Sequence, residues 1–458
     1  MIVNAVIAEY NPFHNGHKYH LENSRRLTGA DHTIAVISGN FVQRGAPALV
    51  DKHTRTRMAL RNGADLVLEL PAVYATASAE RFAAGAVALL EKLGVVTHLC
   101  FGSECGDLAA LRRAALVLAR EPEMFSAKLK TLLREGLSYP AARAEALTRC
   151  LPESEGIKEL LSSPNNILGI EYVKAILRQN SAMEPITVKR IGPGYHDADT
   201  DRHGNHSGDT DYHGNYSGAT GRPGNHSGDT DCFGNYSGAT GCFGNHGDAA
   251  FCSAHALRQA IREGKSISEL SRWLPEPAAA LLSARLAEGA VLCEDDLSDI
   301  LYYKLLQEKA SGYRRYLDVS RELSDRIENR LPEYRGFRAF CNLLKTRELT
   351  YARISRCLLH IVLDLTKEDA LLWERQDLIP YVRVLGFRRD AAGLLTALKA
   401  KASVPLITKL ADGEKLLPRD AVPLFRRELS ISQLYLGLSA NKKGGVPSNE
   451  YTVPLVIL

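Results

Sequence analysis

The sequence predicts an α/β fold, in which a parallel sheet covered by helices is followed by a mostly helical C-terminal part. Two patterns predict it. Short apolar runs rich in β-branched residues alternate with helical spacing in the N-terminal part, and helical spacing dominates from about residue 266 onward. With 458 residues, 45% hydrophobic and 24% charged, the composition is ordinary for a globular protein of two or three domains.

Four apolar runs in the N-terminal part are predicted to be buried strands, at residues 2–10, 32–40, 65–71 and 97–102. Helical spacing at 17–28, 51–63 and 76–93 separates them. Ligands of parallel sheets bind beyond the carboxyl ends of the strands. The polar segments 11–16, 38–44, 71–78 and 102–104 each follow a strand. We therefore expect four loops to meet at one edge of the sheet.

The remaining elements complete the predicted organisation. Helical patterns run through 107–150, a helix is expected at 162–177 with Ser163 or Asn165 near its start, and 186–192 is predicted to be a strand. Residues 266 to about 400 are predicted to be nearly all helical, and the tail is expected to add a strand or two. We expect one domain at 1–265 and a helical one at 266–458.

Residues 199–247 differ from the rest of the chain because they repeat with a period of ten. The segment lacks Leu, Ile, Val and Met, so it cannot bury a core of its own. We interpret it as an expanded insert with no required function. Because six of the 14 histidines lie between His196 and His246, weak metal binding is the alternative.

The charge distribution and the cysteine content limit the classes of protein to which this chain can belong. The net charge of +4 is uneven, since residues 301–458 carry 27 Lys and Arg against 18 Asp and Glu. This surplus favours a polyanionic partner such as RNA over a merely solvated helical face. No run is long enough to cross a membrane, no signal peptide is recognisable, and the nine cysteines include no CxxC pair. We expect a cytoplasmic protein; its oligomeric state is left open.

The stretch EYNPFHNGHKYH, after the first strand, carries three histidines three residues apart: His14, His17 and His20. They could hold a metal, line an anion site, or be satisfied within the fold. A strand that ends in a tight loop and enters a helix offers free N–H groups to an anion, and Gly16 lets a phosphate approach. A metal trio is disfavoured because His14 precedes the glycine and no HExxH pattern occurs. The loop therefore favours phosphate, and no metal ligand is assigned.

The residues His14-Asn15-Gly16-His17 match the HxGH signature of the nucleotidyltransferase superfamily. Further segments follow in order: SGNFVQRGAPALVDKHTRTRMAL, GADLVLELP, FGSE, SPNNILGIEYVKA, KRIGPGYHD and YVRVLGF. Together they resemble the bacterial tRNA(Met) cytidine acetate ligase family over nearly the whole chain except the repeat. The resemblance implies a Rossmann-like nucleotidyltransferase domain in the N-terminal part.

The resemblance also implies an activity. Acetate and ATP, the latter with Mg²⁺, would form acetyl-adenylate, and the acetyl group would pass to N4 of the wobble cytidine of elongator tRNA(Met). His14, His17 and Lys52 would be catalytic. The residues that would bind ATP are Ile7, Ala8, Glu9, Tyr10, Asn11, Pro12, Phe13, His14, Asn15, Gly16, His17, Lys18, Tyr19, His20, Gly102, Asn165, Arg190, Ile191, Ser253 and Arg258.

Other residues are candidates for the same site. Arg55, like Lys52, could face the triphosphate, and Asp51 could cap their helix. Gln43 and Arg44 are candidates for the acetate or cytidine end. Tyr195, His196 and Asp197 end the KRIGPGYHD motif and are expected near ATP.

The second phosphate-binding loop of the resembled family reads SASAIR, and here it reads SAHALR. Ser253 and Arg258 persist, whereas His255 stands where a second serine is expected. Histidine is larger than serine and donates one hydrogen bond, so it would crowd the pyrophosphate.

Basic and aromatic residues of the C-terminal part are candidates for RNA contact. Arginines and lysines would bind phosphates, and an aromatic ring would stack an unstacked base. The candidates are Lys345, Arg347, Arg353, Arg356, Arg383, Arg388 and Arg389, with Tyr381 or Phe387 as the stacking ring.

Two rival functions remain. A small-molecule adenylyltransferase of the same superfamily needs no large basic helical part. A non-catalytic RNA-binding protein does not explain the HxGH loop among converging strand ends.

Deleting about residues 199–247 is expected to leave folding and acetyl-adenylate formation intact, because the entropy of loop closure grows slowly with loop length. Circular dichroism and acetate-dependent pyrophosphate release measure the two properties. Loss of activity in a folded deletion variant would show that the repeat is required.

Overall fold

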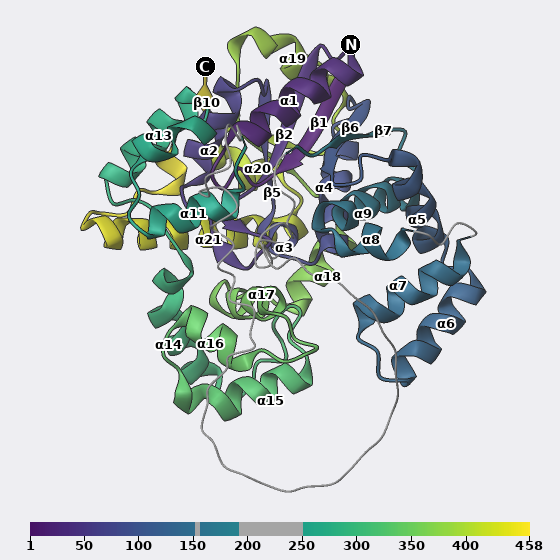
Figure 1. The fold of residues 1–458 in the computed structure, drawn as a ribbon. Helices are drawn as coiled ribbons and strands as arrows, with labels where there is room; N and C mark the ends of the chain where they lie inside the picture. Colours follow the sequence, from purple (N-terminus) through teal and green to yellow (C-terminus); the bar gives the residue numbers. More distant parts are fainter. Residues whose placement is uncertain (152–155, 192–250) are drawn as a thin grey trace, which may run out of the picture.

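The computed structural model describes residues 1–151, 156–191 and 251–458 (Figure 1). The decapeptide repeat and the candidates Tyr195, His196 and Asp197 lie outside these residues. Among the described helices, none combines the length and apolarity needed to cross a membrane.

An eight-stranded sheet organises the N-terminal part. Its order is β10-β8-β5-β2-β1-β6-β7, with β9 paired to β8. Strands β5, β2, β1, β6 and β7 are all parallel. The chain leaves β1 in one direction and returns to its other side at β6, so ligands are expected beyond the carboxyl ends near β1. The strands are β1 (Val3–Ala8), β2 (His32–Ser38), β5 (Leu66–Leu70), β6 (His98–Ser103), β7 (Glu184–Lys189), β8 (Val382–Phe387), β9 (Leu406–Ile407) and β10 (Val456–Ile457).

The five parallel strands and the two tail strands confirm the sequence predictions, but β8 was missed. Residues 266 to about 400 are not nearly all helical, because Val382–Phe387 pairs antiparallel with β5. A six-residue apolar run inside a long helical region is recognised as a strand only when its partner is known. The C-terminal part therefore contributes three strands to the sheet, and the division at residue 265 stays a prediction.

Helices cover both faces of the sheet. One face buries Val3, Ile34 and Leu66 against α4, α5 and α9, and the other buries Val6, Ile37 and Val67 against α2, α11 and α13. The helices up to residue 191 are α1 (Asn15–Thr28), α2 (Lys52–Arg61), α3 (Ala72–Ala75), α4 (Ala79–Lys92), α5 (Leu108–Arg120), α6 (Glu123–Arg134), α7 (Tyr139–Cys150), α8 (Ile157–Ser162) and α9 (Pro164–Arg178).

The helices between residues 292 and 365 surround a core of their own, which Ile431 joins, and they lie below the sheet in Figure 1. Phe41, Ala72 and Tyr435 join that core, so the strand-end segments after β2 and β5 touch it directly. The helices after residue 251 are α11 (Ala254–Arg262), α12 (Ile267–Leu270), α13 (Glu276–Ala287), α14 (Ser298–Glu308), α15 (Arg321–Arg330), α16 (Phe337–Leu344), α17 (Tyr351–Val362), α18 (Lys367–Arg375), α19 (Ala392–Lys401), α20 (Gly413–Leu416) and α21 (Val422–Lys443).

A buried ion cluster joins α2, β5, β8 and the C-terminal segment. Lys52 Nζ donates to Glu69 Oε1 at 2.8 Å and lies 2.9 Å from Glu450 Oε1. Arg383 contacts the same two carboxylates at 3.1 and 2.6 Å, and the Lys52 ammonium also donates to Ser432 Oγ at 2.5 Å. Oppositely charged residues more than 300 positions apart in sequence thus neutralise one another in this cluster.

This cluster corrects the role expected for Lys52. The side chain is fully buried and its ammonium is engaged by Glu69, Glu450 and Ser432, so it presents no exposed group to a triphosphate. The periodicity that places a lysine on a helix does not reveal which face of the helix is covered by another part of the chain.

Replacing Lys52 by methionine is expected to lower the free energy of unfolding by about 3–5 kcal/mol, because two buried carboxylates would share one remaining cation. Chemical denaturation measures the change. Lys18→Met is the matched control, since Lys18 is half exposed and lies 3.9 Å from Glu22. Equal, small effects of both substitutions would contradict a structural role for Lys52.

Candidate active site

Two histidines cap helix α1 reciprocally at the end of β1. His14 is the N-cap residue, and its Nδ1 accepts the backbone N–H of Gly16 at 3.0 Å. His17 Nδ1 in turn accepts the backbone N–H of His14 at 3.2 Å. A Cβ on residue 16 would lie 2.9 Å from His14 Cε1, so only glycine lets the ring fold back in this way. The two rings stack, with centroids 3.8 Å apart.

These hydrogen bonds fix the tautomer of both rings. A nitrogen that accepts a backbone N–H carries no proton, so a neutral imidazole must be protonated at the other nitrogen. His14 and His17 therefore each have an Nε2–H group. The helix start is satisfied by the Nδ1 atoms, and the Nε2–H groups remain as donors.

Burial and nearby arginines keep these rings neutral. Burial, followed by the charges of Arg190 and Arg258, lowers the pKa of His14 to about 3. The pKa of His17 is lowered well below its usual value by burial, His14 and Arg190. Burial and Arg190 lower the pKa of His20 to about 4. The site is thus electropositive through its arginines while the histidines stay uncharged, which suits an anionic ligand.

Arg190 reaches the loop from β7, two strands away from β1. Its backbone N–H donates to Ser103 O at 2.9 Å, and its Cγ would lie 3.4 Å from a Cβ on Gly102. The structure therefore brings together Gly102, Arg190 and the histidine loop, as predicted from three separate strand ends. Ile191 follows Arg190 and is 54% exposed.

Among the other residues of the first loop and the start of α1, some are buried and pack against the histidines, and others lie nearer the surface. Tyr10 and Phe13 are buried, and their rings contact the His17 ring at centroid distances of 5.0 and 5.5 Å. Asn11 Oδ1 accepts the Leu49 N–H at 2.7 Å, and a cis peptide bond joins Asn11 to Pro12. Ile7 and Ala8 are half-buried at the end of β1. In α1, Asn15 Nδ2 donates a hydrogen bond to Arg272 O, and the Tyr19 ring packs on Phe251. Lys18 forms an ion pair with Glu22.

The segment after β2 is tied to the first loop. Glu9 Oε1 accepts the Gln43 N–H at 2.8 Å. Burial, followed by the charge of Arg44, lowers the pKa of Arg258 to about 10. Gln43 and Arg44 sit in the hairpin of β3 (Phe41–Val42) and β4 (Ala46–Pro47), which rests on α17. Gly45, at φ +80, would place a Cβ 2.3 Å from Arg356 N. The hairpin therefore lies between the first loop and the C-terminal helices.

Arg55 does not face a triphosphate, contrary to expectation. Its fully buried guanidinium donates to the carbonyls of Val50 at 3.1 Å, Glu9 at 2.8 Å and Ser38 at 2.9 Å, and also to Gly39 O. Asp51 caps α2 as predicted, accepting the Thr54 N–H at 2.8 Å. The segment 71–78 packs against the C-terminal helices, where Thr76 Oγ1 lies 3.1 Å from His360 Nε2.

Helix α11 brings the second predicted phosphate loop to the first. Ser253 caps the helix, accepting the Ala256 N–H at 3.1 Å, and Arg258 Nη1 donates to Asn11 O at 2.6 Å. Burial, then Arg258 and Arg44, lower the pKa of His255 to about 4, and its buried Nε2 has no hydrogen-bond partner among the described residues. His255 is therefore neutral and lies within electrostatic range of Arg258 and Arg44.

Glu104 is a residue of this edge that the sequence reasoning did not single out. It follows Ser103 of β6, and its Oε1 accepts Asn165 Nδ2 at 2.6 Å while its Oε2 accepts the Asn166 N–H at 2.9 Å. Asn165 is thus not the cap of α9; the N-cap residue is Ser163, whose side chain makes no cap bond. An acidic residue directly after a strand end, in FGSE, was the available signal.

Several C-terminal candidates are structural instead. Arg383 belongs to the buried ion cluster, and Tyr381 is buried between Trp373 and Phe425, so neither can meet RNA. Phe387 is half-buried in β8, and Arg388 pairs with Asp390. Arg356 is half-buried against the hairpin, whereas Lys345, Arg347, Arg353 and Arg389 are exposed.

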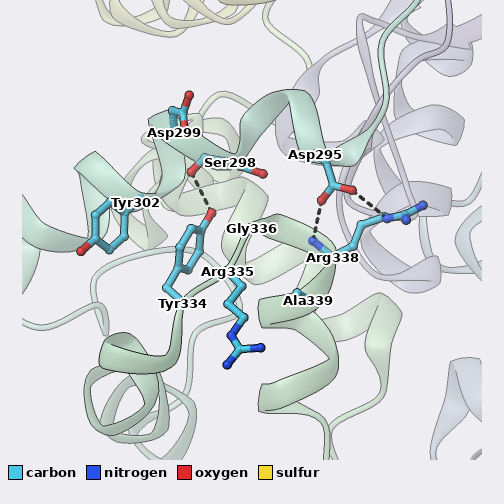
Figure 2. Close-up of a pocket in the computed structure, with 9 residues that line it drawn as sticks. All are labelled: Asp295, Ser298, Asp299, Tyr302, Tyr334, Arg335, Gly336, Arg338 and Ala339. Atoms are coloured by element: carbon cyan, nitrogen blue, oxygen red, sulfur yellow. Dashed lines mark hydrogen bonds and ion pairs between the residues drawn. The ribbon is translucent and has the colours of Figure 1, made fainter.

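A shallow pocket of about 600 Å³ lies on the C-terminal helices, and none of its lining residues is a predicted nucleotide contact (Figure 2). Tyr302 and Tyr334 stack there with ring centroids 5.1 Å apart, and Arg338 pairs with Asp295 at 2.9 Å. The pocket is lined by Asp295, Ser298, Asp299, Tyr302, Tyr334, Arg335, Gly336, Arg338 and Ala339.

Replacing His14 tests the capping role. His14→Ala is expected to lower the free energy of unfolding by about 1 kcal/mol at pH 7.5, because the helix loses its cap, whereas His14→Asn keeps a good cap residue. Because the folded pKa of about 3 lies below the usual 6.5, the unfolded chain binds the proton first. Wild-type stability should therefore fall as the pH drops from about 6.5 toward 3, and less steeply in His14→Asn.

Thermal unfolding across this pH range measures both effects. Equal losses in the alanine and asparagine variants at pH 7.5 would contradict the cap. An unchanged pH slope in His14→Asn would contradict a neutral buried ring.

Comparisons with known proteins identify the family of this chain. The profile of the HIGH Nucleotidyl Transferase family matches residues 1–210 and 244–446. The chain is 38% identical to the tRNA(Met) cytidine acetate ligase of Clostridium kluyveri over 96% of both chains, and 35% identical to that of Acetivibrio thermocellus over the full length of both. Its structure matches Thermotoga maritima TmcAL bound with alpha-thio ATP, with a TM-score of 0.81 and 30% identity over all of both chains. The chain belongs to the HIGH nucleotidyl transferase family and, within it, to the tRNA(Met) cytidine acetate ligases.

Proposed function

We propose that this chain is an ATP-dependent ligase that joins acetate to N4 of the wobble cytidine of elongator tRNA(Met), through acetyl-adenylate. The observation that carries the proposal is the pair of neutral, stacked imidazoles, each with an Nε2–H donor, beside Arg190 and Arg258. The names of relatives that cover the full chain and the ATP analogue bound to the structural neighbour support ATP and tRNA as substrates.

In the first step, an oxygen of acetate forms a bond to the α-phosphorus of ATP, and the bond to the α,β-bridging oxygen breaks. Negative charge builds on the α-phosphate oxygens and on the departing pyrophosphate. Donors fixed in advance stabilise such charge without reorganising. We assign the Nε2–H groups of His14 and His17 to the α-phosphate, and Arg190 and Arg258 to the remaining charge.

In the second step, the N4 amine of cytidine attacks the acetyl carbonyl, AMP leaves with the oxygen that joined it to the acetyl group, and the amine loses a proton. The cytidine must be unstacked to reach the carbonyl. The hairpin carrying Gln43 and Arg44 lies between the nucleotide loop and α17. We assign it to the acetate and cytidine end of the site.

Phosphates of the anticodon arm are assigned to exposed basic residues near α17. Lys345, Arg347 and Arg353 lie at the surface of the C-terminal helices, and α17 supports the hairpin through Ser355, whose Oγ donates to Gly45 O at 2.9 Å. Such contacts position an RNA without reading its sequence. A polyanion bound on this surface would lie beside the hairpin.

The protein's own groups near the histidines do not fit a resident Mg²⁺. They are imidazoles, guanidinium groups and backbone N–H groups, whereas Mg²⁺ prefers oxygen ligands. Glu9 already accepts the Gln43 N–H, and Glu104 accepts bonds from α9. Mg²⁺ is therefore proposed only as an ion that ATP brings, and no step depends on it.

The rival functions make different predictions. Labelled acetate, ATP and bulk tRNA are incubated with the protein, and the digested RNA is analysed for N4-acetylcytidine. Pyrophosphate release without acetylated RNA would favour a small-molecule adenylyltransferase. RNA binding without pyrophosphate release would favour a binding protein.

His14→Asn tests the assigned chemistry. The variant keeps the helix cap but lacks the Nε2–H donor, so we expect acetate-dependent exchange of pyrophosphate with ATP to slow by about 10²–10³-fold. Arg26→Met is the matched control, because Arg26 lies on the same helix, is exposed and donates to Asn23 Oδ1 at 2.9 Å. A variant as active as wild type would contradict the role of His14 at the α-phosphate.

A further inference from the structure

We infer that Glu104 is a positioning residue, which turns the side-chain amide of Asn165 so that its carbonyl oxygen reads a hydrogen-bond donor of the nucleoside of ATP. The inference rests on the proposed function and deepens it: it names the residue that orients a nucleoside contact and the class of group that contact accepts.

Glu104 stands where the nucleoside is expected. It lies two residues after Gly102, at the carboxyl end of β6, and β6 is the neighbour of β1 in the sheet. In the pairing of β6 with β7, Ser103 lies opposite Lys189, so Glu104 and Arg190 leave the sheet side by side. After burial, the positive charge of Arg190 contributes to the lowered pKa of all three histidines of the first loop.

Helix α9 is pinned to this strand end by both packing and hydrogen bonds. A Cβ on Gly169 would lie 2.6 Å from the Phe101 ring, so helix and strand are in close contact. Asn166 Oδ1 accepts the Cys105 N–H at 3.1 Å, while Glu104 Oε2 accepts the Asn166 N–H at 2.9 Å. The first turn of α9 and the residues after β6 therefore hold each other in one arrangement.

Within this arrangement the chemistry of Glu104 decides the orientation of Asn165. Glu104 Oε1 lies 2.6 Å from Asn165 Nδ2 and 3.3 Å from the Asn165 backbone N. A carboxylate only accepts hydrogen bonds, so the NH₂ end of the amide must face Glu104. The carbonyl oxygen Oδ1 is thereby directed away from Glu104, and it accepts no hydrogen bond from the residues that the structure describes.

The Asn165 carbonyl beside the Glu104 carboxylate forms an edge that can accept hydrogen bonds from a ligand but cannot donate any. Adenosine offers two kinds of donor, the ribose hydroxyls and the 6-amino group of adenine. Inosine carries an oxygen in place of that amino group, so an accepting edge would repel it. Without Glu104 the amide could turn over and present its NH₂ end, and the selectivity would be lost.

Binding of ATP, 2′-deoxy-ATP, 3′-deoxy-ATP and inosine triphosphate is measured by calorimetry without acetate. In the wild type we expect the analogue that lacks the recognised donor to bind about 10-fold more weakly than ATP, and this identifies ribose or adenine as the source. In Glu104→Gln, and also in Asn165→Ala, the ratio should fall to about 2-fold or less, with KM for ATP raised more than kcat is lowered.

Asp107→Ala is the matched control. Asp107 lies three residues beyond Glu104 and caps α5 by accepting the Ala110 N–H at 3.1 Å. It should lower thermal stability and leave the ratio unchanged. The inference is overturned if the wild type binds ATP but treats all analogues alike, or if Glu104→Gln keeps the wild-type ratio. Failure of the wild type to bind ATP would instead overturn the proposed function.

Discussion

One buried guanidinium, that of Arg55, holds the edge of the sheet together. It donates to the backbone carbonyls of Glu9 after β1, Ser38 at the end of β2 and Val50 before α2. Buried carbonyls need partners, and a planar five-donor group can serve several at once. One side chain therefore joins the first loop to the segment after β2, and the histidines proposed for the α-phosphate lie in that loop.

At this edge of the sheet, the arginines carry positive charge and the histidines are neutral. Arginines at the end of β7 and in α11 supply positive charge, and burial, together with this charge, keeps the histidines neutral. A charged imidazole would donate from both nitrogens and could not accept the backbone N–H groups that begin α1. The cap of α1, the neutral charge of the two rings and the presence of the Nε2–H donors thus all depend on the same protonation state of His14 and His17.

The C-terminal part is built into the sheet, and this explains how one chain can join a nucleotide site to an RNA surface. Strand β8 extends the sheet, and Glu450 and Ser432 complete the charge balance around Lys52. Glu428 accepts the Ala72 N–H with both oxygens, at 3.0 and 2.9 Å, and its burial raises its pKa to about 8. The helices that support the hairpin are therefore fixed relative to the strand ends.

The sequence by itself determined the parallel sheet, its strand-end loops and the histidine pair with Gly16. Each of these depends on local periodicity or on the chemistry of a few adjacent residues. The sequence also placed Gly102, Arg190 and Arg258 in the candidate site by resemblance, and the structure brings them to one edge.

Only the tertiary structure decided the roles of Lys52, Arg55 and Arg383, of the strand β8 and of Glu104. A charged residue is exposed, catalytic or structural according to what covers it, and the groups that cover Lys52 lie from 17 to nearly 400 positions away. The same holds for β8, whose partner strand precedes it by more than 300 residues. Burial and pairing between distant segments are decided by packing, which local sequence patterns do not encode.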